Sequence, residues 1–163
     1  MNNGTPNPNV PPKPRVLIVD DKPSNLLALD AVLADYDVLS ANSGKEALSL
    51  LEKNDVDVII LDIQMPVMDG YETARHIKKM ERCHKTPIVF ITAIFNEDPH
   101  VTKGYEVGAI DYFTKPFDPE ILKMKIGIYA SFRQKDALLK EKEKRIRELE
   151  ELLKAAENRH TKF

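Results

Sequence analysis

The chain has 163 residues, with 24 basic and 26 acidic side chains and a formal net charge of −2. This length fits one domain of ordinary size with an appendage. Without a basic excess there is no global electrostatic drive toward nucleic acid, and no apolar run is long enough to cross a bilayer. The single cysteine, Cys83, fits a reducing compartment. We therefore expect a cytoplasmic protein that binds neither nucleic acid nor membranes.

Residues 1–14 are expected to form a disordered arm, because five prolines stand there among small and polar residues. From Arg15 onward, short β-branched apolar runs alternate with segments of helical period. This alternation is typical of strands in a parallel sheet joined by helices. The predicted strands are Arg15–Val19, Asp37–Ser40, Asp57–Leu61, Ile88–Ile91 and Ile110–Phe113.

Four helices are predicted between these strands. The first begins at Pro23, and its expected buried stripe is Leu26, Leu27, Leu29, Val32 and Leu33. Ser43 is expected to cap the second helix, with Glu46 completing a capping box. Gly70 opens the third, and the fourth covers about 98–107.

The last predicted helix is unusually long. It begins near Asp118, and a helix over 119–157 would be roughly 55 Å long at about 1.5 Å per residue. Five strand–helix repeats indicate an α/β fold with a doubly wound, five-stranded parallel sheet of the flavodoxin-like type, with strand order 2-1-3-4-5. The long helix extends from this fold at its C-terminal end.

Chemically useful side chains follow four of the predicted strands. Asp20 and Asp21 come after the first strand, Asp62 after the third, Thr92 after the fourth and Lys115 after the fifth. The functional crevice of such sheets lies beyond the carboxyl ends of the strands. Three clustered carboxylates suit Mg²⁺, and the added lysine and hydroxyl suit a phosphoryl group that Asp62 would attack. Each residue alone has an ordinary explanation as a turn former or cap, so the prediction rests on their joint placement.

Four segments resemble the receiver domains of two-component response regulators. They are RVLIVDD, VIILDIQMPVMDG, PIVFITA and DYFTKPF, and the resemblance covers residues 15–128. It implies that Asp62 accepts the phosphoryl group from a histidine kinase or phosphotransfer protein. It also implies that Asp20, Asp21, Asp62 and the backbone carbonyl of Gln64 hold Mg²⁺.

The same resemblance assigns roles near the fifth strand. It implies that Lys115 and Thr92 contact the phosphoryl group, that the Lys115–Pro116 bond is cis, and that Tyr112 is the switch residue coupled to Thr92. The signal would leave through the surface formed by the fourth helix, fifth strand and fifth helix. The chain would then be a signalling receiver, with only self-catalysed phosphotransfer and slow loss of the phosphoryl group, and no enzyme in the ordinary sense.

Two other functions on related folds are considered. A Mg²⁺-dependent phosphatase with an aspartyl nucleophile typically has a second aspartate two residues later and carries the nucleophile on the first strand, whereas Gln64 occupies that position here. A flavodoxin-like cofactor binder needs a phosphate loop where Asp20 and Asp21 would repel the phosphate.

Residues 129–163 are expected to form a helical coiled-coil extension. A heptad register places Phe132, Leu139, Ile146 and Leu153 at a, and Ile128, Leu149 and Ala156 at d. Lys135 and Lys142 also fall at d and weaken the register. Arg145 at g would face Glu150 at e of a parallel second copy, which favours a parallel homodimer over a solitary helix. Such helices resemble those that connect N-terminal receivers to output domains. Two alternatives stay open: a missing C-terminal output domain follows this helix, or the chain acts alone through its coil.

Overall fold

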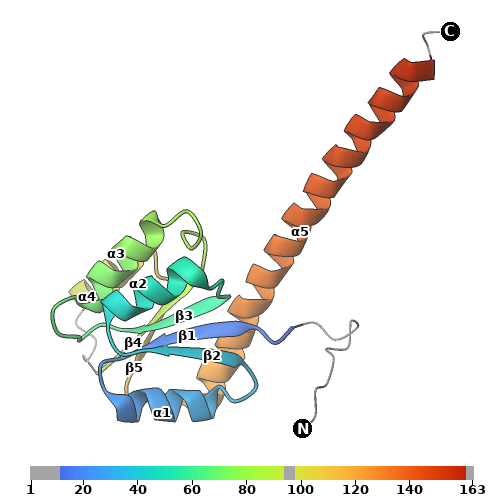
Figure 1. Ribbon diagram of the computed structural model, residues 1–163. Coiled ribbons are helices and arrows are strands. Elements are labelled where there is room, and N and C mark those ends of the chain that lie inside the picture. The colour runs from blue at the N-terminus through green and yellow to red at the C-terminus, as the bar shows by residue number, and fades with distance from the viewer. Residues whose placement is uncertain (1–11, 94–97, 161–163) are drawn as a thin grey trace.

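A computed structural model describes residues 12–93 and 98–160 of the chain (Figure 1). Its centre is a parallel five-stranded sheet with the order β2-β1-β3-β4-β5, which confirms the fold predicted from the sequence. The predicted arm lies almost wholly outside the described residues, which include only 12–14 of it. The strands are β1 (Arg15–Val19), β2 (Asp37–Ala41), β3 (Val58–Asp62), β4 (Ile88–Thr92) and β5 (Asp111–Thr114).

The strands are aligned so that their carboxyl ends share one edge of the sheet. Asp62 pairs with Ile91, and Thr92 pairs with Thr114. The strand boundaries differ from the predicted ones by at most one residue, so Asp62, Thr92 and Thr114 are the last residues of their strands instead of the first residues after them. The predicted site residues therefore still gather at this edge.

Five helices cover the sheet within the described ranges: α1 (Pro23–Val32), α2 (Gly44–Lys53), α3 (Gly70–Lys79), α4 (Asp98–Glu106) and α5 (Pro119–His160). The hydroxyl of Ser43 accepts a hydrogen bond from the amide of Glu46 at 3.1 Å, as predicted. The Glu46 carboxylate, however, accepts from the amide of Asn42 at 2.7 Å and so completes the cap one residue earlier than expected. Asp69 caps α3 in the same way, accepting from the amide of Glu72 at 2.8 Å.

Two clusters of buried apolar side chains lie on the two faces of the sheet. Figure 1 shows α2 and α3 over one face, and α1 and the start of α5 over the other. Alternate strand residues point to opposite faces, so Leu17 packs toward α2 and α3, whereas Ile18 packs toward α1 and α5. The prediction for Leu27 was wrong, because its side chain is 72 % exposed. Leu29 and Leu33 are buried and define the stripe of α1, and Leu27 points well away from that stripe at about 100° per residue.

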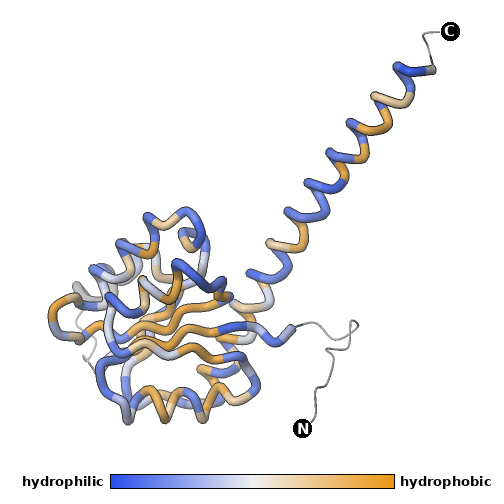
Figure 2. Tube along the Cα trace, viewed as in Figure 1, coloured by the Kyte–Doolittle hydropathy of each residue, from blue (hydrophilic) through white to orange (hydrophobic). Residues whose placement is uncertain are grey.

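Helix α5 is 42 residues long and has two parts. Its first turns pack against the sheet through the fully buried Leu122, Ile126 and Ala130. The remainder projects away from the domain, and Figure 2 shows hydrophobic positions recurring along its otherwise hydrophilic length. Across the described residues, no helix combines the length and apolar character needed to span a membrane.

Candidate functional site

Three aspartates lie together at the carboxyl edge of the sheet. Asp20 and Asp21 follow β1, and Asp62 ends β3, the neighbouring strand. One carboxylate oxygen from each lies within 4.8 Å of the other two. Asp20 is only 1 % exposed and Asp62 only 7 %, so the negative charges are concentrated where water screens them poorly.

Asp20 is fixed by three donors. The amide of Lys22 donates to one carboxylate oxygen at 2.9 Å, and the side-chain amide of Asn25 donates to the other at 2.9 Å. The ammonium group of Lys115 reaches that second oxygen at 3.0 Å. Asn25 was not predicted from the sequence, although its place in the first turn of α1, four residues after Asp21, was a usable signal.

Asp62 and Asp21 remain poorly neutralised by the protein itself. Burial, together with the charges of Asp20 and Asp21, raises the pKa of Asp62 to about 6, although Lys115 and the amide of Ile63 oppose this rise. One carboxylate oxygen of Asp21 is buried without a hydrogen-bond partner within the described part of the chain. Both features fit a hard divalent cation such as Mg²⁺, which binds carboxylate oxygens readily. The acidic cluster could therefore bind a metal ion.

Lys115 brings a positive charge from β5 to this cluster. Its ammonium nitrogen lies 3.0 Å from Asp20 and 4.0 Å from Asp62. The residue follows Thr114, its amide donates to the carbonyl of Thr92 at 2.8 Å, and the Lys115–Pro116 bond is cis, as expected. An incoming anion would meet this ammonium group beside Asp62.

Thr92 and Gln64 flank Asp62 on two sides. Thr92 is fully buried at the end of β4, whose preceding residue pairs with Asp62. Gln64 lies in the exposed turn after β3, which is closed by a hydrogen bond from the amide of Gly70 to the carbonyl of Ile63 at 2.9 Å. A Cβ atom on Gly70 would overlap the carbonyl oxygen of Asp62 and approach the Cα of Ile63 to 2.7 Å. Glycine therefore lets α3 start directly behind the aspartate.

Tyr112 lies one layer behind the acidic cluster. Its ring meets Phe90 edge to face with centroids 6.5 Å apart, and its hydroxyl oxygen is buried. The Tyr71 ring also meets Phe90 edge to face, with the ring centroids 5.3 Å apart. A Cβ on Gly104 would come within 3.2 Å of Phe90 and 3.5 Å of Tyr112, so α4 packs closely on both rings. A change in the position of Tyr112 would thus be felt by α4.

Comparison with known proteins identifies the family. Residues 16–127 match the response regulator receiver domain. The chain belongs to this family. Receiver domains are modules of two-component signalling, for which phosphorylation and magnesium are general features, and the resemblance described above is confirmed. The roles assigned to individual site residues stay predictions.

Solved structures and curated relatives agree with this membership. The receiver is similar to the chemotaxis response regulator CheY4 of Vibrio cholerae, with 34 % identity, a TM-score of 0.67, and coverage of 72 % of this chain and 98 % of that one. It is 39 % identical over 127 residues to a Vibrio cholerae protein named "Probable cyclic di-GMP phosphodiesterase", covering 76 % of this chain and 28 % of the relative. It is 34 % identical to the transcriptional regulator RpaA of Synechocystis, covering 77 % of this chain and 52 % of the relative. The chain thus spans about half or less of these two curated relatives.

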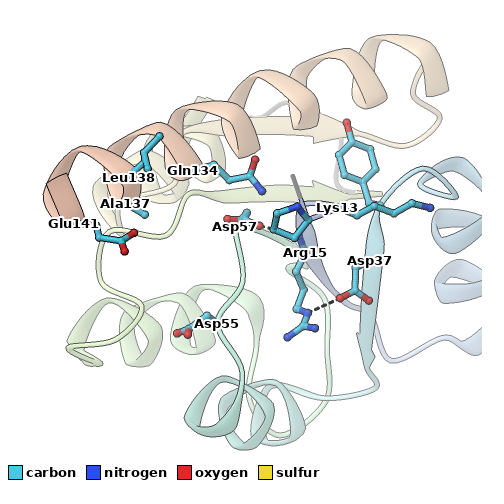
Figure 3. Close-up of a pocket in the computed structure, with 11 residues that line it drawn as sticks. Lys13, Arg15, Asp37, Asp55, Asp57, Gln134, Ala137, Leu138 and Glu141 are labelled. Atoms are coloured by element: carbon cyan, nitrogen blue, oxygen red, sulfur yellow. Dashed lines mark hydrogen bonds and ion pairs between the residues drawn. The ribbon is translucent and has the colours of Figure 1, made fainter. Parts of the chain in front are cut away.

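A pocket of about 990 Å³ lies at the opposite edge of the sheet, between the strand starts and the departing α5 (Figure 3). Three of its four acidic side chains accept hydrogen bonds from arginines. Arg15 binds Asp37 at 2.7 Å and donates its amide to Asp57 at 2.8 Å, while Asp55 binds Arg82 at 2.7 Å. The acidic cluster, by contrast, has a buried carboxylate oxygen without a hydrogen-bond partner at Asp21 in the described part of the chain and a raised pKa at Asp62, so we take the carboxyl edge as the candidate functional site.

Proposed function

We propose that the receiver accepts a phosphoryl group on Asp62 from the phosphohistidine of a histidine kinase or phosphotransfer protein, with Mg²⁺ bound by Asp20, Asp21, Asp62 and the carbonyl of Gln64. The observation that carries this proposal is the convergence of three carboxylates within 4.8 Å and one ammonium group 4.0 Å from Asp62. With a divalent cation bound to the three carboxylates, such an arrangement would favour an anion that arrives beside the nucleophile.

In the proposed transfer, an oxygen of Asp62 forms a bond to phosphorus while the bond between phosphorus and the donor histidine nitrogen breaks. The histidine nitrogen keeps the electron pair and takes up a proton. Lys115 neutralises charge on the phosphoryl oxygens, and the hydroxyl of Thr92 donates to one of them. When bound, Mg²⁺ would supply further positive charge to these oxygens.

The test is incubation of the full chain with acetyl phosphate and MgCl₂, followed by intact mass measurement. One phosphoryl adduct is expected, absent in Asp62→Asn and present in the matched control Asp30→Asn, which changes an exposed aspartate on α1. Removing the metal with EDTA should also abolish the adduct. An adduct that persists in Asp62→Asn would contradict the proposal, and many turnovers of acetyl phosphate without an adduct would indicate a phosphatase instead.

Transmission is proposed to run from Thr92 to Tyr112. If the Thr92 hydroxyl turns toward the phosphoryl group, the space it leaves admits a shift of the Tyr112 ring, which packs against Phe90 and α4. The affected surface is formed by α4, β5 and α5. The expected readout is a change in partner affinity or dimerisation on phosphorylation.

The projecting part of α5 is proposed to transmit the signal together with the surface formed by α4, β5 and α5. We propose residues 15–128 as the receiver, 129–163 as the extension and a parallel homodimer through that extension, because its a and d positions are mostly apolar and exposed. The relatives of greater length support a further proposal, that this helix passes the signal to an output domain, which in them belongs to an enzyme or a transcriptional regulator.

Disulfide trapping tests the parallel orientation. Ile146→Cys, at an a position, should crosslink with itself under mild oxidation, because identical a residues face each other in a parallel pair. The control Lys144→Cys, on the opposite side of the helix, should crosslink far less. Equal crosslinking of the two variants would argue against a coil.

A further inference from the structure

Helix α5 carries an exposed apolar stripe that begins inside the receiver. Eight large apolar side chains, each between 45 and 68 % exposed, lie along one side of the helix at spacings of three, four or seven residues: Ile121, Met124, Ile128, Phe132, Leu139, Ile146, Leu149 and Leu153. The stripe lies away from Leu122, Ile126 and Ala130, which bind the sheet. The heptad register of the extension therefore continues back into the receiver as far as Ile121, with lysines instead of apolar residues at positions 125, 135 and 142.

A second copy of this chain is the occupant that the charges favour. Within this register Arg145 at g faces Glu150 at e of a parallel copy, whereas an antiparallel copy would bring like charges together. The apolar a and d residues of the stripe also meet their own equivalents when two copies are placed in parallel, while Lys135 and Lys142 meet theirs at two d layers and weaken the pairing there.

Lys125 is the one charged residue at an a or d position between Ile121 and Phe132. In the receiver its ammonium group is turned toward the sheet, where it binds the Asp111 carboxylate at 2.8 Å and lies 5.1 Å from the centre of the Phe113 ring. The hydroxyl of Tyr129 donates to the same Asp111 oxygen at 2.6 Å. Asp111 thus holds a positive charge away from the apolar stripe.

The Asp111 carboxylate is buried, ionised and held by several hydrogen bonds. Asp111 is buried at the start of β5, and burial acts to raise its pKa, but the hydrogen bonds from Lys125, Tyr129 and the amide of Tyr112 outweigh that effect and lower the pKa. The Tyr112 amide donates to the other carboxylate oxygen at 2.8 Å. The same carboxylate is therefore bonded both to the backbone of the proposed switch residue and to the lysine beside the stripe.

We propose that two copies of the chain pair in parallel along the stripe from Ile121 to Leu153. Asp111 permits this pairing because it binds the ammonium group of Lys125 and keeps it out of the contact between the two helices. This inference rests on the parallel dimer of the proposed function and extends it into the receiver. If Lys125 is released, two ammonium groups face each other at one a layer and oppose the dimer. Any movement of β5 that loosens Asp111 then weakens the contact between copies.

Sedimentation equilibrium of the full chain tests the inference with four variants. Asp111→Asn should raise the dimer Kd about tenfold or more, because like charges placed opposite each other at an interface are costly. Lys125→Met should leave the Kd equal or lower, since it removes the charge and adds apolar surface. The double variant should return to within about twofold of Lys125→Met. Lys123→Met is the matched control, because Lys123 pairs with Asp35, away from the stripe.

A purely structural role for the ion pair predicts the opposite pattern. If Lys125→Met weakens the dimer as much as Asp111→Asn, or if the double variant is not rescued, the inference is overturned. Circular dichroism of each variant checks that α5 stays folded. If Asp111→Asn unfolds, the dimer Kd of Lys125→Met still tests the inference, because a weaker dimer in that variant would overturn it. A wild-type chain that stays monomeric would overturn the proposed dimer as well, whereas the phosphoryl adduct on Asp62 is measured separately by mass.

Discussion

Replacing Asp62 with asparagine should stabilise the metal-free protein at neutral pH. The folded-state pKa of Asp62 is raised from 3.8 to about 6, chiefly by burial and by the charge of Asp20. A raised carboxyl pKa means that the folded state binds the proton more tightly than the unfolded state does. Stability is therefore lost as the pH rises from about 4 to about 6, and the loss is complete above that window.

The magnitude follows from the size of the shift. A rise of about two pKa units corresponds to about 3 kcal/mol, since one unit is about 1.4 kcal/mol. Asp62→Asn carries no charge in either state, so it should escape this loss and raise the free energy of unfolding by up to about 3 kcal/mol at pH 7.5. At pH 4 the ionisation penalty should shrink below about 1 kcal/mol.

Urea unfolding in EDTA at both pH values measures the effect, with Asp30→Asn as the control for losing a surface charge. The control should change stability by no more than about 0.5 kcal/mol. Adding MgCl₂ at pH 7.5 should stabilise the wild type more than Asp62→Asn and so narrow the difference. If Asp62→Asn is no more stable than the wild type at pH 7.5, or if its advantage does not depend on pH, the crowding of buried carboxylates is not the cause.

Three further substitutions test other parts of the site. Lys115→Ala should slow formation of the adduct from acetyl phosphate by about 100-fold, the usual order for losing one charge-stabilising donor; an unchanged rate in the mass assay would exclude Lys115 from the transfer. Thr92→Val should keep part of the phosphorylation but remove its effect on dimerisation, and a normal response in sedimentation would refute the coupling. Gly70→Ala should lower the free energy of unfolding by about 1–3 kcal/mol in urea melts, because its Cβ has no room beside Ile63 and Asp62; unchanged stability would mean that α3 adjusts freely.

The fold and the grouping of the acidic residues were predictable because topology determines both. Once five apolar runs are taken as parallel strands, the residues at their carboxyl ends must share one edge, whatever their rotamers. A boundary error of one residue at Asp62 or Thr92 did not matter, since the side chain stays at the same edge. Leu27 was different, because a stripe of five leucine and valine residues is wider than the face that one short helix can bury.

Features that depend on a particular rotamer were not predictable from the pattern. Asn25 could have pointed outward from α1, and only the structure shows it donating to Asp20. The same holds for the Asp111 contacts, which join residues 14 and 18 positions apart in the chain. Heptad counting places Lys125 on the stripe, whereas its ammonium group lies against β5.

The contact between Lys125 and β5 suggests how phosphorylation at Asp62, if it occurs as proposed, would reach the 42-residue helix α5. The acidic cluster and the stripe share no side chain, so the proposed signal would pass through an element that touches both. Strand β5 is such an element, because Lys115 at its carboxyl end reaches Asp62 and Asp111 at its start holds Lys125. If this four-residue strand moves as one unit, the proposed chemistry at its two ends is coupled.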